Sequence, residues 1–162
     1  MLEAALYIVA TPIGHLDDIT IRAVQVLREV DVIAAEDTRT AQTLMRAHGL
    51  QKSMLSLHRD NEAQRIQSLL RRLEAGESVA LISEAGTPCI SDPGYLLVRA
   101  VVEAGHKVTP VPGASAVIAA LSASGLPSHH FVFLGFLPQR NGRRKRILKT
   151  YKYIPATLVL YE

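Results

Sequence analysis

The sequence has a single cysteine, Cys89, no tryptophan, and no uninterrupted apolar run of about 18 residues. A lone cysteine cannot form an internal disulfide, which fits a reducing cytoplasm. The missing apolar run predicts no transmembrane helix, and residues 1–5 contain Glu3 and no basic segment, which argues against a secretory signal peptide. We therefore expect a cytoplasmic protein without a membrane partner.

Several signature motifs are also missing. The sequence contains no G-x-G-x-x-G, no G-x-x-x-x-G-K-[ST] and no G-x-S-x-G. These absences disfavour a dinucleotide-binding Rossmann site, a P-loop and an α/β-hydrolase nucleophile elbow. The six histidines include no pair at HxxxH spacing, and no metal site is predicted.

Short apolar segments alternate with segments of helical period along most of the chain. Asp17 or Asp18 is expected to cap the first helix, and Thr38 the second. The alternation predicts an α/β fold with a doubly wound, mostly parallel five-stranded sheet. The predicted strands are residues 6–10, 31–35, 54–57, 79–82 and 107–111.

Residues 79–94, V-A-L-I-S-E-A-G-T-P-C-I-S-D-P-G, organise this pattern. A buried strand runs into a connection of about twelve residues, where about 2–6 would suffice. Ordinary turn chemistry is the alternative interpretation. Unusual residues also follow three other strands, as T-P-I-G at 11–14, E-D-T-R at 36–39 and P-G-A-S-A at 112–116. Because parallel strands end at one edge of a sheet, the four loops predict a small-molecule site there.

The composition changes after residue 125. All three phenylalanines fall within residues 131–136, and residues 138–153 hold seven of the 18 basic residues and no acidic one. We expect an N-terminal α/β domain at residues 1–125 and the incomplete beginning of a second α/β domain at residues 126–162. The basic run indicates a polyanionic partner, although a solvated helix face is the alternative.

The loop motifs resemble those of the tetrapyrrole-methylase-like superfamily of S-adenosylmethionine-dependent methyltransferases. The matching segments are L-Y-I-V-A-T-P-I-G-H-L-D-D-I-T, I-A-A-E-D-T-R, V-A-L-I-S-E-A-G-T-P-C-I-S-D-P-G, V-P-G-A-S-A and G-F-L-P, and they span almost the whole chain. The similarity is greatest to the branch that methylates the ribose 2′-hydroxyl of a cytidine in 16S rRNA of the small ribosomal subunit. Family members continue beyond the Y-E segment, so the chain is expected to be a fragment.

The resemblance implies S-adenosylmethionine as cofactor, 16S rRNA as partner and a homodimer. Two alternatives stay open: a tetrapyrrole, corrin or diphthine-type methyltransferase, and a binding fragment without turnover. The implied cofactor-binding residues are Pro12, Ile13, Gly14, Ser83, Glu84, Ala85, Gly86, Thr87, Ile90, Gly113, Ser115 and Ala116.

Catalysis of this reaction needs an acceptor for the hydroxyl proton. Asp37 and Glu36 are the candidates, and Arg39 could hold a substrate phosphate. A charged helix N-terminus is the alternative interpretation of these residues. The expected RNA-binding residues are Arg140, Arg143, Arg144, Lys145 and Arg146.

Overall fold

A computed structural model describes residues 2–162, which divide into two compact units, one that ends at Ser115 and one that spans Ala116–Glu162. The predicted domain boundary after residue 125 stays a prediction. Within residues 2–162, no helix is both long and apolar enough to cross a membrane.

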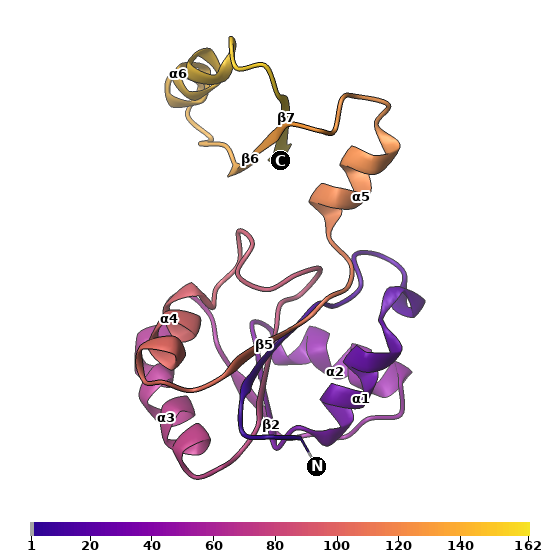
Figure 1. The fold of residues 1–162 in the computed structure, drawn as a ribbon, viewed down its shortest axis with the longest axis vertical. Coiled ribbons are helices and arrows are strands. Elements are labelled where there is room, and N and C mark those ends of the chain that lie inside the picture. The colour runs from indigo at the N-terminus through magenta and orange to yellow at the C-terminus, as the bar shows by residue number, and fades with distance from the viewer. Residues whose placement is uncertain (1) are drawn as a thin grey trace. The chain divides into compact units, whose positions relative to one another are not determined.

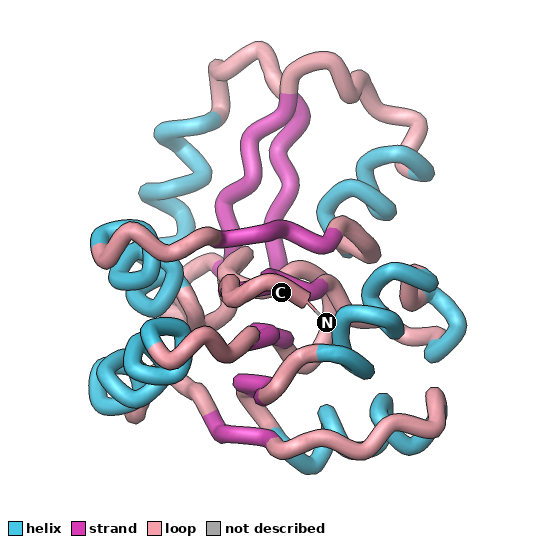
Figure 2. The backbone as a smooth tube through the Cα atoms, turned by 60° about the horizontal axis from the view of Figure 1, so that its bottom comes forward, coloured by secondary structure: helices cyan, strands magenta, loops and turns pink. Residues whose placement is uncertain are grey.

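The first unit is built on a parallel sheet of five strands in the order β3-β2-β4-β1-β5, which confirms the predicted fold class. β1 and β4 lie at its centre, with Leu6 paired to Val79. Figure 2 shows the strands side by side with helices flanking them. The strands are β1 (Leu6–Val9), β2 (Val32–Ala35), β3 (Met54–Ser56), β4 (Val79–Ile82) and β5 (Val108–Val111).

Two pairs of helices cover the two faces of this sheet (Figure 1). On one face, α1 (Ile21–Glu29) and α2 (Thr38–Ala47) contribute Leu27 and Met45 to the core. On the other face, α3 (Glu62–Glu74) and α4 (Tyr95–Glu103) contribute Leu69 and Leu97. Every residue of β2 and β4 is buried, as expected for central strands of a parallel sheet, and this explains their continuous apolar runs.

Two predicted helix caps were wrong. Thr20 caps α1, because its Oγ1 accepts the Ala23 N–H at 3.1 Å, whereas Asp17 and Asp18 belong to a preceding 3₁₀ turn, η1 (Leu16–Asp18). Asp37, not Thr38, caps α2. Residues able to form a cap lie within a few positions of each other in both stretches, so the sequence alone does not select which of them starts the helix.

The second unit contains α5 (Ala116–Ala123), β6 (Phe131–Phe136), α6 (Asn141–Tyr151) and β7 (Thr157–Tyr161). β6 and β7 form a parallel pair, in which the rings of Phe133 and Tyr161 meet edge to face at 4.9 Å. A hollow of about 700 Å³ lies beside them and is lined by Phe136, Arg144 and Leu160, among others.

Candidate functional site

Three of the four predicted loops are joined at the carboxyl edge of the five-stranded sheet. The loop after β1 bonds to the loop after β4, because Thr11 and Gly86 exchange backbone N–H···O bonds of 2.9 and 3.0 Å. The Thr87 hydroxyl donates to the Ala114 carbonyl at 3.1 Å, which ties in the loop after β5. The convergence predicted from parallel strand ends is therefore present for these loops.

Close backbone approach at this edge depends on two glycines. A Cβ on Gly86 would lie 3.3 Å from Ile13 Cγ2, and Gly86 has a φ of +80°. A Cβ on Gly113 would lie 3.0 Å from the Ala10 Cβ. A side chain at either position would force its neighbour to shift by a few tenths of an ångström, and at Gly86 the positive φ would add strain, so both glycines favour this close approach.

The predicted cofactor residues differ in exposure. Ser83 is buried at 6%, whereas the side chains of Ile13 and Ile90 are 36% and 44% exposed. Large apolar side chains exposed beside polar loops are available to contact a ligand. Ala116 begins α5 and belongs to the second unit. The other predicted residues of the 11–14, 83–88 and 112–115 loops are Pro12, Gly14, Glu84, Ala85, Gly86, Thr87, Gly113 and Ser115.

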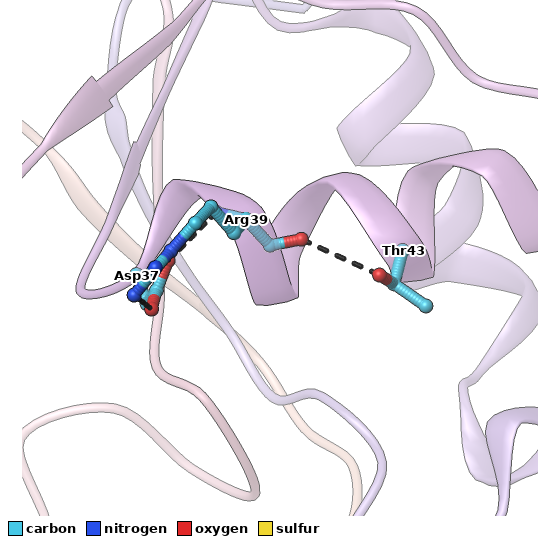
Figure 3. A network of polar contacts seen from close by, with 3 residues as sticks. All are labelled: Asp37, Arg39 and Thr43. Carbon is cyan, nitrogen blue, oxygen red and sulfur yellow. Dashed lines mark hydrogen bonds and ion pairs between the residues drawn. The ribbon is translucent and has the colours of Figure 1, made fainter.

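Asp37 and Arg39 form a hydrogen-bonded ion pair at the start of α2 (Figure 3). Arg39 donates to Asp37 from Nη2 at 2.8 Å, from Nε at 3.2 Å and from its backbone N–H at 2.7 Å. Hydrogen bonds from Arg39 lower the pKa of Asp37 to about 2. A carboxylate held in this way is a weak base, and it orients the exposed guanidinium beside it.

Glu36 has the opposite environment. It is half-buried, and its pKa is raised by burial and by the charges of Asp92 and Glu84. Burial also raises the pKa of Asp92, with a contribution from Glu84. These carboxylates come from the loops after β2 and β4, so the two loops share one electrostatic environment. Of the two predicted proton acceptors, Glu36 is therefore the stronger base.

Sequence reasoning missed two residues that hold the 83–94 loop. The Glu62 carboxylate accepts N–H bonds from Gly94 and Leu97, and the Arg59 guanidinium donates to the Ser91 carbonyl. Both lie at least 32 residues before their partners along the chain, in a turn and helix start of ordinary composition. Only the fold brings them together.

The thiol of Cys89, inside this loop, is expected to react slowly. Burial, with the charge of Glu62, raises its pKa from the ordinary 9.0 to about 11. At about pH 8 this leaves about 100-fold less thiolate, so iodoacetamide should alkylate the native chain about 100-fold more slowly than the urea-unfolded chain. Equal rates in the two states would contradict the half-buried position of Cys89.

The predicted RNA-binding residues lie in the second unit, at the N-cap of α6 and in the first half of this helix. Arg140, Arg143, Lys145 and Arg146 are exposed, whereas Arg144 is half-buried against the hollow and donates to Asn141 Oδ1 at 2.5 Å. Between residues 2 and 162, no cluster of three or more His, Cys, Asp or Glu residues could hold a metal ion.

Comparison with known proteins gives a consistent set of relatives. The model of the family Tetrapyrrole (Corrin/Porphyrin) Methylases matches residues 5–162. Ribosomal RNA small subunit methyltransferase I of Escherichia coli O157:H7 is 51% identical over 160 residues, which cover 99% of this chain and 56% of that protein. The protein of the same name from Xylella fastidiosa is 53% identical over 157 residues, covering 97% of this chain and 58% of that protein. The chain thus spans a little over half the length of these relatives.

Solved structures with the same fold are more distant in sequence. Diphthine synthase superposes with a TM-score of 0.76 at 21% identity, over 97% of this chain and 64% of that one. Uroporphyrin-III C-methyltransferase from Thermus thermophilus, in complex with S-adenosyl homocysteine, superposes with a TM-score of 0.65 at 24% identity, over 96% and 68%. Likeness at this level of identity supports the fold alone.

Proposed function

Because the chain belongs to the tetrapyrrole (corrin/porphyrin) methylase family, we propose that it is the part of an S-adenosylmethionine-dependent methyltransferase that carries the cofactor loops and the residues acting on the substrate. The proposed reaction is 2′-O-methylation of a cytidine ribose in 16S rRNA. The observation that carries the proposal is the identity of about half of all residues with ribosomal RNA small subunit methyltransferase I over nearly the whole chain.

S-adenosylmethionine suits the chemistry of the loop edge in two respects. Gly86 and Gly113 let the loops approach one another closely, since a Cβ at these positions would press against Ile13 or Ala10, and this draws the segments proposed to line the ligand together. The charges of Asp92 and Glu84 add to burial in raising the pKa of Glu36, and the charge of Glu84 also raises that of Asp92, so this edge is acidic, which fits a cationic ligand. We assign its binding to the 11–14, 83–90 and 113–116 segments.

The proposed roles of the acidic and basic residues follow from their surroundings. When bound, S-adenosylmethionine supplies an electrophilic methyl group on a sulfonium centre. Glu36 accepts the proton of the attacking 2′-hydroxyl, because its raised pKa makes it the better base. Asp37 orients Arg39, and the Arg39 guanidinium holds a substrate phosphate.

RNA is favoured over a tetrapyrrole or diphthamide precursor as substrate by the relatives' names and by the basic helix α6. The proposed partner is therefore the small ribosomal subunit, and the proposed location is the cytoplasm. A homodimer is proposed as the working unit, on the family resemblance alone.

The substrate assignment is tested with the native polypeptide that contains these residues. Incubation with small ribosomal subunits and radiolabelled S-adenosylmethionine should place the label on a ribose 2′-oxygen of a 16S rRNA cytidine. Label on a base, or transfer to a corrinoid and not to RNA, would contradict the assignment.

Salt dependence tests the proposed contacts of α6 with RNA. We expect the binding constant for 16S rRNA to fall with salt, and we plot its logarithm against the logarithm of the salt concentration. Replacing Arg143, Lys145 and Arg146 together with alanine should make this slope shallower by about 2–3, because each phosphate contact releases about 0.7–0.9 of a counterion. The control is a triple alanine variant of Arg22, Arg28 and Arg46, exposed residues of α1 and α2 that remove the same charge. Equal slopes for the two variants would show that α6 is only a solvated surface.

A further inference from the structure

The loop between β4 and α4 holds its backbone in an unusual conformation. Cys89 and Ser91 have φ angles of 70° and 67°, and between residues 2 and 162 they are the only non-glycine residues with positive φ. Gly86 and Gly94, at 80° and 120°, add two more left-handed positions within the same nine residues. Such conformations are costly for non-glycine residues and persist only where surrounding contacts hold them.

Among the side chains that hold this loop, Glu62 is the one best shielded from water. It is the first residue of α3, its side chain is 5% exposed, and among residues 2–162 it is the only charged residue in the buried class. Its Oε1 accepts the backbone N–H of Gly94 at 3.1 Å and that of Leu97 at 3.0 Å. The carboxylate therefore caps the first turn of α4 from a different helix.

The packing around Gly94 explains why the cap comes from elsewhere. The N-cap position of α4 is Gly94 itself, which has no side chain to accept the free N–H groups. A Cβ there would lie 2.6 Å from Leu81 Cδ2 and 2.8 Å from Cys89 Sγ at a φ of +120°, so a serine, threonine or aspartate would be strained and would have to displace these side chains. Without Glu62, the N–H groups of Gly94 and Leu97 would be buried and unsatisfied.

A second tether comes from the same turn. Arg59 Nη2 donates to the carbonyl of Ser91, one of the left-handed residues, at 3.0 Å. The turn is itself fixed, because Asn61 Oδ1 accepts the His58 N–H at 2.9 Å and its Nδ2 donates to the Ser56 carbonyl at 3.2 Å. The start of α3 thus holds the strained half of the loop at two points.

We propose that Glu62 is a positioning residue for cofactor binding: by capping α4 it holds the 83–94 loop in the conformation that presents Thr87 and Ile90 to S-adenosylmethionine. This inference rests on the proposed function. Arg59 assists from an exposed position and contributes less.

Two substitutions separate the cap from the charge. Glu62→Gln and Glu62→Ala both remove the carboxylate charge, which itself raises the pKa of the Cys89 thiol, but only alanine removes the acceptor oxygen. We expect Glu62→Ala to bind S-adenosylmethionine about tenfold more weakly than Glu62→Gln in calorimetric titrations. We also expect Cys89 to be alkylated at least about tenfold faster in Glu62→Ala than in Glu62→Gln, because the loop opens more often. Equal values for the two variants in both measurements would overturn the proposal.

A control variant separates loop positioning from general loss of stability. Leu73→Ala removes a buried side chain from the far end of the same helix, away from the loop in sequence. Compared at matched free energies of unfolding, it should leave Cys89 alkylation and cofactor affinity near wild type. A Leu73→Ala chain that behaves like Glu62→Ala would show that Glu62 acts only through stability.

The two measurements also distinguish this inference from the proposed function. Cys89 alkylation reports on the loop whether or not the cofactor binds. Wild-type protein that fails to bind S-adenosylmethionine would remove the proposed function, and with it the positioning role, even if alkylation showed the loop to be held by Glu62. If the wild-type protein binds S-adenosylmethionine but Glu62→Ala and Glu62→Gln give the same affinity and the same alkylation rate, only the positioning role would be removed.

Discussion

Glu36→Gln is expected to lower methyl-transfer turnover by about 10²–10⁴-fold, the usual contribution of a general base, while affinity for S-adenosylmethionine stays near wild type. The amide keeps the size of the side chain but cannot accept the hydroxyl proton. Single-turnover rates with small ribosomal subunits and calorimetric titration with the cofactor measure the two effects. The matched control is Asp37→Asn, which keeps a capping oxygen at the start of α2 and loosens only the pairing with Arg39.

For Asp37→Asn we expect a loss of about tenfold in turnover, because Arg39 loses a charged partner but remains in place. If Asp37→Asn were the more damaging variant, Asp37 and not Glu36 would be the acceptor. The pH profile gives a second check: turnover should rise with pH as Glu36 ionises, through a pKa above the ordinary 4.5.

The same raised pKa predicts the sign of a stability change. Between the unfolded and folded pKa values of Glu36, the folded state binds more protons, so stability falls as pH rises through that window. At neutral pH the ionised Glu36 is therefore unfavourable to the fold, and Glu36→Gln should raise the unfolding temperature while abolishing most of the turnover. A lower unfolding temperature would show that the carboxylate has a structural role instead.

Gly94→Ala is expected to give the largest loss of stability, about 2–5 kcal/mol in urea unfolding. An alanine at a φ of +120° costs about 1–2 kcal/mol, and forcing its Cβ against Leu81 and Cys89 costs about 1–3 kcal/mol more. Leu81 is 2% exposed and belongs to β4, so it has little room to move.

Gly105→Ala is the matched control for the conformational cost. Gly105 also has a positive φ, +78°, but a Cβ there would meet nothing within 4 Å. This variant should lose only about 1–2 kcal/mol. If the two alanine variants were equally unstable, the close packing of Gly94 against Leu81 and Cys89 would be wrong.

The strands and the loop edge could be predicted from sequence because their signals are local. Val79–Ile82 is a continuous apolar run that ends in turn-forming residues, and parallel strands end at one edge. The electrostatics of Glu36 could not be predicted, because Asp92 is 56 positions away and meets it only in the folded chain. The cap that Glu62 provides was hidden for the same reason. A glutamate at a helix start usually interacts with its own helix, and nothing local shows that it serves another.

Hydrogen exchange of the native polypeptide, with and without saturating S-adenosylhomocysteine, tests the central claim most directly. We predict slower exchange in peptides that cover residues 11–14, 83–90 and 113–116, with other segments of the first unit little changed. Saturable binding that protects none of these three loops, or no binding at all, would contradict the assignment of the cofactor site to the carboxyl edge of the sheet.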